Sequence, residues 1–257
     1  MLLLSLLVPT FSRVKEMVRR VVCSSNLHQQ GIGLQTYAAA YKYYPGHCGQ
    51  ASNGRIVGIW PTRIRRFAGG SREVFSCPSM PDGWKWQVKT GSGAGYAQQA
   101  DVDNWSYELG ELLLDVMLVP FCYGYNDWGS AGWRPTDAET SLGGQKGLGG
   151  DIRWGGYSVP ELSVSRVKLP NDMYAIGDCQ APDGSWDFNI DPTNSTEYPG
   201  NIHSNGANVV FCDGHVLWRL QSDLIVTARD VTTWNDKDKI NAQPWNNHHW
   251  WNAWEGR

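Results

Sequence analysis

Histidine, aspartate and cysteine side chains gather in the last quarter of the sequence, where they could bind a metal ion or exchange a proton. Nine residues separate His203 from the Asp213-Gly214 pair, which Cys212 and His215 flank. Histidine, cysteine and aspartate are all zinc ligands, so these side chains form one candidate metal site. An Asp-Gly pair is equally typical of a tight turn, and no nucleophile with an adjacent base can be named beside it. We therefore interpret His203, Asp213 and Gly214 as a structural motif, with the His203 ring bonded to the turn, and expect no enzyme activity.

Three aspartates that precede this motif are candidate calcium ligands. Asp183, Asp187 and Asp191 lie close together in a segment rich in turn-forming residues. Carboxylate oxygens suit Ca²⁺, although this spacing does not match an EF-hand. Calcium is therefore a better candidate cofactor than zinc, and the alternative is a solvated acidic loop.

The cysteines allow disulfides, because their number is even. Six cysteines permit 15 pairings, and none of them forms a C-x-x-C pair typical of zinc ribbons or thioredoxin-like proteins. The alternative is a set of buried thiols. The candidates are Cys23, Cys48, Cys77, Cys122, Cys179 and Cys212.

Tryptophan is unusually abundant, with 14 residues, and several lie close to the end of the sequence. Aromatic side chains are favoured at protein interfaces. We expect a subunit interface there, with intramolecular packing and glycan binding as the alternatives. The residues concerned are Trp245, Trp250, Trp251 and Trp254.

The overall composition is that of a globular protein. Apolar residues make up 41% and charged residues 18% of the 257 residues, with a formal net charge of −3. This length is ample for a hydrophobic core, and this charge gives no reason to expect a nucleic acid as partner.

The first part of the chain predicts one long amphipathic helix. Residues 1–9 are apolar but too few to cross a bilayer, and they lack the features of a secretory signal peptide. Apolar residues then recur at steps of three, four and seven over residues 10–44, up to Pro45-Gly46. Such a helix would be about 50 Å long, so one end must protrude or pack on other chains. Its basic residues Arg13, Lys15, Arg19 and Arg20 form either a solvated face or a contact with a membrane or a neighbouring subunit.

The rest of the chain predicts short strands joined by long loops. Residues 56–60, 73–75 and 173–177 are typical of strands. Residues 207–212 and 215–220 predict a β-hairpin, with Asp213-Gly214 in a type I′ turn.

Several segments, in this order, resemble the prepilin-type H-X9-DG family, which is similar to type IV pilins and type II secretion pseudopilins. The resemblance extends over nearly the whole chain, and its most specific part is the nine-residue spacing between His203 and Asp213. The segments are LLVP at 6–9 with SRVK at 12–15 and RRVVCSSNL at 19–27, FSCPS at 75–79, YGYN at 123–126, AIGD at 175–178, and HSNGANVVFCDG at 203–214.

This resemblance implies an α+β, pilin-like fold, in which a long N-terminal helix packs on an antiparallel β-sheet with large loop insertions. Residues 1–44 would form the helix and residues 45–257 a β-rich head. The resemblance also implies a structural subunit that polymerises through its helix into an extracellular filament. Its partners would be copies of itself, the inner membrane before assembly, and the pilus or secretion machinery there. The assembly residues would be Leu6, Leu7, Phe11, Val14, Val18, Val21 and Val22.

Two other functions are open at this stage. One is a low-copy pseudopilin of a type II secretion pseudopilus, and the other is a surface carbohydrate-binding module. The family's basic leader, its cleavage site of glycine then phenylalanine, and the apolar stretch that follows have no counterpart in this sequence. We therefore expect the chain to correspond to the family from the middle of the long helix onward.

Overall fold

The computed structural model describes most of the helix and of the central sheet, and about half of the head. The described residues are 2–50, 56–80, 86, 95–114, 121–126, 147–148, 151–152, 161–179, 188–192, 195–225 and 250.

A single helix, α1 (Leu2–Tyr41), forms the long axis of the molecule. The predicted helix is confirmed, and it begins at Leu2 and continues through Pro9. It also ends before Pro45, because Lys42 adopts a left-handed conformation with φ of 66°. The Lys42 amide still donates to the Ala38 carbonyl at 2.9 Å, which closes the last turn.

The head is built on a five-stranded sheet in the order β6-β3-β5-β7-β8. All neighbouring strands are antiparallel except β3 and β6, which are parallel. The chain therefore has the predicted α+β fold, a long N-terminal helix with a mainly antiparallel sheet, which is consistent with a pilin-like protein. The strands are β3 (Tyr123–Asn126), β5 (Tyr174–Asp178), β6 (Asn189–Ile190), β7 (Gly206–Phe211) and β8 (Val216–Leu220).

The predicted hairpin is confirmed as β7 and β8, but its turn differs from the prediction. Val210 pairs with Val216, and the Phe211 amide donates to the His215 carbonyl at 2.9 Å, which leaves a loop of three residues. Only Gly214 in this loop has a positive φ, whereas a type I′ turn would need two such residues. The loop is held to the neighbouring chain, since the Asp213 amide donates to the Pro170 carbonyl at 3.0 Å.

A second group of elements lies on the other side of α1. It contains a three-stranded sheet in the order β2-β1-β4 and several short helices. Residues 73–75 were predicted as a strand, but they form a 3₁₀ helix, which ends where the Ser76 amide donates to the Glu73 carbonyl at 3.0 Å. These elements are β1 (Cys48–Gln50), β2 (Ile56–Ile59), α2 (Trp60–Arg65), η1 (Arg66–Ala68), η2 (Glu73–Phe75), α3 (Gln99–Trp105) and β4 (Asp151–Ile152), while η5 (Val164–Arg166) and α5 (Gln221–Leu224) complete the described helices.

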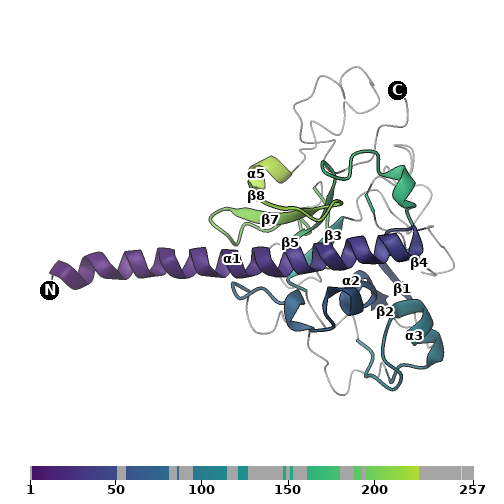
Figure 1. The fold of residues 1–257 in the computed structure, drawn as a ribbon. Helices are drawn as coiled ribbons and strands as arrows, with labels where there is room; N and C mark the ends of the chain where they lie inside the picture. The colour runs from purple at the N-terminus through teal and green to yellow at the C-terminus, as the bar shows by residue number, and fades with distance from the viewer. Residues whose placement is uncertain are drawn as a thin grey trace.

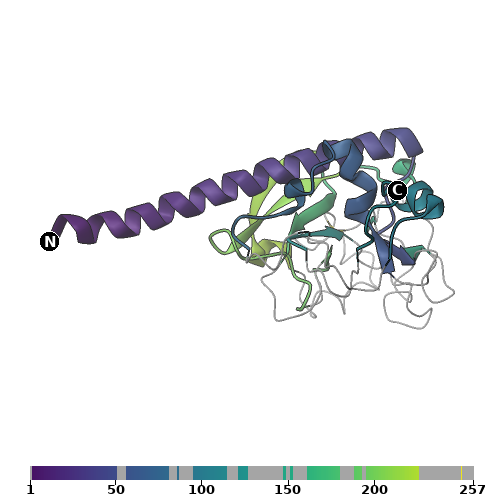
Figure 2. The same ribbon diagram turned by 90° about the horizontal axis from the view of Figure 1, so that it is seen from below.

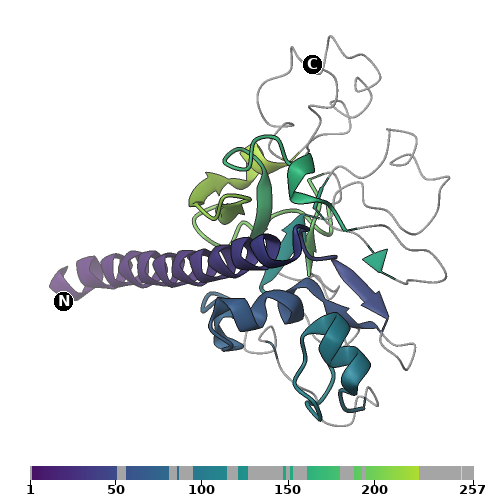
Figure 3. The same ribbon diagram turned by 45° about the vertical axis from the view of Figure 1, so that its right-hand side comes forward.

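The C-terminal half of α1 lies along the head, and its N-terminal half projects beyond the head (Figures 1 and 2). β7 and β8 contact α1 from one side, and α2, η1 and η2 contact it from the other. Figure 3 shows the two groups of elements diverging from the helix. None of the helices in the described residues is both long enough and apolar enough to cross a membrane.

Candidate functional site

The N-terminal part of α1, as far as Val22, carries a row of exposed apolar side chains. Phe11 and Val21, for example, keep 69% and 65% of their surface exposed. Steps of three and four along a helix place such residues on one side of it. We call Phe11, Val14, Val18, Val21 and Val22 the apolar row.

The opposite side of α1 is also apolar, but the head covers it. Cys23, Leu27 and Leu34 are completely buried there. The helix thus has two apolar sides, and the head covers only one of them. Every predicted assembly residue whose side chain the structure describes belongs to the exposed side, while the side chains of Leu6 and Leu7 lie outside the described part of the chain.

The basic residues of α1 do not share one environment. Arg13 and Lys15 are exposed, whereas Arg19 and Arg20 are half-buried. The guanidinium carbon of Arg20 lies 5.5 Å from the centre of the Trp218 ring on β8, so this cation packs against the head.

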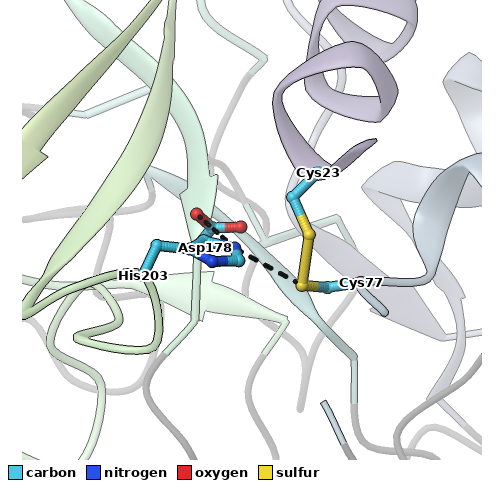
Figure 4. Close-up of side chains that lie close together, drawn as sticks. All are labelled: Cys23, Cys77, Asp178 and His203. Carbon is cyan, nitrogen blue, oxygen red and sulfur yellow. Dashed lines mark hydrogen bonds and ion pairs between the residues drawn. A yellow bond between two sulfur atoms is a disulfide. The ribbon is translucent and has the colours of Figure 1, made fainter. Parts of the chain in front are cut away.

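His203, the first residue of the H-X9-DG motif, is completely buried between α1 and the sheet. Its Nδ1 is 3.0 Å from Oε1 of Glu16 on α1. Its Nε2 is 3.6 Å from the sulfur of Cys77 and 3.6 Å from Oδ2 of Asp178 on β5. Figure 4 shows the imidazole between the carboxyl group and the sulfurs.

The prediction that the His203 ring bonds to the turn at Asp213 is therefore wrong. The two residues lie at opposite ends of β7, because His203 precedes this strand and Asp213 follows it. Asp213 bonds instead to His215, with 2.5 Å between Oδ1 and Nδ1. The proposed zinc quartet of His203, Cys212, Asp213 and His215 does not come together either, since His203 lies with Cys23, Cys77 and Asp178.

Asp178 is the completely buried carboxyl group of the site. Its Oδ2 accepts hydrogen bonds from the amide of Asn208 at 2.7 Å and from the Asn208 side chain at 3.0 Å. Burial raises the pKa of Asp178 to about 6, although His203 and the Asn208 donors favour the ionised form. Its Oδ1 is buried without a hydrogen-bond partner.

A disulfide between Cys23 and Cys77 joins α1 to the segment after η2, beside the His203 ring. This is one of the pairings that the cysteine count allowed. The other four cysteines are buried and form no disulfide in the described residues. For these four, the structure matches the alternative interpretation of buried thiols. Burial raises the pKa of the Cys212 thiol far above its ordinary value, so this group stays protonated at neutral pH.

Most of the candidate calcium ligands and C-terminal aromatics lie outside the described residues. Among the aspartates, only Asp191 is described, and it is buried, while Asp183 and Asp187 are not described. Among the tryptophans, Trp250 is described and completely buried, 5.2 Å from the Tyr174 ring. That position matches intramolecular packing. Trp245, Trp251 and Trp254 lie outside the described residues.

Sequence reasoning missed two members of the buried site, Glu16 and Asp178. Glu16 was visible as the one acidic residue within the basic run of the helix, and Asp178 as a charge at the end of an apolar strand. Neither feature of the sequence identifies a partner. Glu16, for example, is 187 residues from His203 in the chain.

The comparisons with known proteins give one family match. The model of a family described as a protein of unknown function (DUF1559), SBP_bac_10, matches residues 12–60, from α1 to the start of α2. No curated protein and no solved structure matches the chain. The matched segment includes Glu16, Cys23 and most of the apolar row.

Proposed function

We propose that this protein is a structural subunit of an extracellular, type IV pilin-like filament that polymerises through α1. The observation that carries the proposal is the exposed apolar row on the N-terminal part of α1. The α+β fold and the family match over residues 12–60 are compatible with it.

The free energy of exposed apolar surface favours assembly. Burying apolar area contributes about 25 cal/mol per Å², and five large side chains on one side of a helix offer a continuous contact. Bundling the projecting helices of several copies would bury this row while the heads remain outside. A membrane could cover the same row before assembly, which fits the proposed route from the inner membrane through a pilus or secretion machinery.

The role that we propose is structural and not enzymatic. It requires no cofactor, and calcium binding by Asp183, Asp187 and Asp191 stays a separate prediction. A low-copy pseudopilin would use the same helix surface, so copy number distinguishes the two functions.

Electron microscopy of the full chain, isolated from cells and their medium, tests this proposal. We expect filaments with an axial rise of roughly 10 Å per subunit, as helices offset by several residues would give. The Val18→Asp variant should raise the concentration needed for assembly more than tenfold, because a carboxylate buried without a partner costs several kcal/mol. Gln29→Asp is the matched control, since Gln29 is exposed on the same helix beyond the apolar row.

Filaments that form equally well with Val18→Asp would show that the apolar row is not the assembly surface. Particles that remain monomers or dimers at every concentration would contradict a filament subunit. They would favour the low-copy pseudopilin or the carbohydrate-binding module instead.

A further inference from the structure

Four potential metal ligands converge where α1 meets the sheet. Cys23, Cys77, Asp178 and His203 each offer one ligand atom, and these atoms all lie within 4.8 Å of one another. All four residues are buried. Figure 4 shows that they come from four separate segments, so only the folded chain can bring them together.

Two sulfurs, one imidazole nitrogen and one carboxylate oxygen are a ligand set for Zn²⁺. Zinc binds sulfur at about 2.3 Å and nitrogen or oxygen at about 2.0–2.2 Å, usually as a tetrahedron in structural sites. Ligand atoms of such a tetrahedron are about 3.3–3.8 Å apart. The 3.6 Å distances from His203 Nε2 to Cys77 Sγ and to Asp178 Oδ2 are already in this range.

The surroundings of His203 orient its ring for a metal. A carboxylate accepts hydrogen bonds, so with Glu16 Oε1 3.0 Å from Nδ1, a neutral ring that binds a metal would carry its proton on Nδ1 and its lone pair on Nε2. This lone pair faces Cys77 and Asp178. Metal-binding histidines commonly donate their other ring N–H to a carboxylate in this way.

Asp178 provides independent support. Its Oδ1 is completely buried and has no hydrogen-bond partner. A buried polar atom without a partner is costly, and a cation beside the carboxylate would compensate for this cost.

We propose that the reduced chain binds one Zn²⁺ ion through Cys23, Cys77, His203 and Asp178, with Glu16 orienting the histidine. The bound ion and the Cys23–Cys77 disulfide exclude each other, because both use the same two sulfurs. A small disulfide such as oxidised glutathione would interconvert them. The two thiolates lose two electrons and form the S–S bond. The oxidant's S–S bond accepts these two electrons and breaks, its two sulfurs take up two protons from solvent, and Zn²⁺ leaves. This proposal is independent of filament formation.

The first test measures zinc in the full chain, reduced without oxygen, incubated with zinc and freed of excess metal. We expect one zinc per chain by elemental analysis, and a thiolate-to-metal charge-transfer band when Co²⁺ replaces zinc. A folded, reduced chain that holds no zinc would overturn the proposal.

Variants locate the ion. Cys77→Ser and His203→Gln should lose the zinc, whereas the matched controls Cys212→Ser and His215→Gln should keep it. Glu16→Gln should weaken binding about tenfold or more, because it acts through the histidine. Controls that lose the zinc as readily as the site variants would contradict this assignment.

A measurement on the unchanged chain covers the case in which a variant fails to fold. Alkylation of each cysteine, followed by mass spectrometry with and without zinc, should show slower reaction of Cys23 and Cys77 when zinc is present. Oxidised glutathione should then release one zinc per Cys23–Cys77 disulfide formed. Zinc that binds without slowing the alkylation of these two cysteines would place the ion elsewhere and refute the proposal.

Discussion

At the scale of single residues, α1 is attached to the segment before and after Phe75 by three side chains on one side of the helix. Cys23 forms the disulfide with Cys77, Asn26 donates to the Ser76 carbonyl at 2.9 Å, and Gln30 donates to the Val74 carbonyl at 2.6 Å. The two hydrogen bonds, from Asn26 and Gln30, satisfy backbone carbonyls that the short η2 helix leaves unpaired. Polar side chains thus determine how this segment lies along α1.

The ion pairs of Glu111 with Arg65 and Arg72 make the stability of the chain depend on pH. Glu111 accepts two hydrogen bonds from Arg65, at 2.5 and 2.7 Å, and also pairs with Arg72. Burial would raise the pKa of Glu111, but the Arg65, Glu108 amide and Arg72 donors outweigh it and lower the pKa to about 2. The folded-state pKa is below the unfolded value, so this stabilisation is complete above about pH 4.5 and is lost as pH falls toward 2.

We predict that the free energy of unfolding falls more steeply with acid in the unchanged chain than in a Glu111→Gln variant. Between about pH 6 and about pH 3, the difference should reach about 2 kcal/mol. Urea denaturation at both pH values measures it. Equal losses in both chains would mean that the Arg65 and Arg72 contacts do not hold the Glu111 carboxylate in its ionised form.

At the scale of elements, periodicity predicted the long helix and alternation predicted the hairpin. Pro9 did not stop α1, and Pro45-Gly46 did not end it, because Lys42 had already left the helical conformation. The three-residue turn was missed because contacts from Pro170 and Met173 hold Asp213 and Cys212, and local sequence does not show them.

The candidate site was harder to predict than the elements. The five residues of the apolar row, which the family resemblance implied as assembly residues, are all exposed, but helical spacing alone does not distinguish them from the buried apolar side, and Met17 is exposed as well. The buried cluster depends on contacts between distant segments. His203 was singled out by its motif, but its partners Glu16, Cys77 and Asp178 belong to α1, the η2 region and β5.

Two glycines in α1 let the helix approach both groups of elements. A Cβ atom on Gly31 would lie 3.0 Å from the Gly214 carbonyl oxygen of the hairpin loop. A Cβ atom on Gly33 would lie 2.9 Å from the Cβ of Ala68 and 3.1 Å from the Ile64 carbonyl oxygen. Helix-forming preference would favour alanine at both positions, so close packing explains these glycines.

We predict that Gly33→Ala destabilises the chain by about 1–2 kcal/mol, because overpacking against α2 and η1 exceeds the gain of about 1 kcal/mol in helix propensity. Chemical denaturation measures the change. Ser25→Ala, at an exposed position of the same helix, should change stability by less than about 0.5 kcal/mol. A Gly33→Ala variant that is more stable than the unchanged chain would mean that α1 can move away from Ala68.

At the scale of the whole molecule, α1 is the element that both halves of the head share. The hairpin packs on one side, α2 and η1 pack on the other, and the side chains of the apolar row remain exposed. Contacts to α1 therefore decide whether the long helix and the head behave as one body, as the proposed filament subunit would require.

The Cys23–Cys77 disulfide should stabilise this arrangement as a whole, because its two cysteines are separated by 54 residues in the chain. Closing a loop of this length lowers the entropy of the unfolded chain and stabilises the fold by about 2–4 kcal/mol. We predict that a reductant lowers the free energy of unfolding by this amount, provided that a chelator keeps zinc from replacing the disulfide. A chain with both cysteines changed to serine should show the lower stability with and without reductant. If reductant destabilised that double variant equally, its effect would come from another source, and α1 would be held by packing and hydrogen bonds alone.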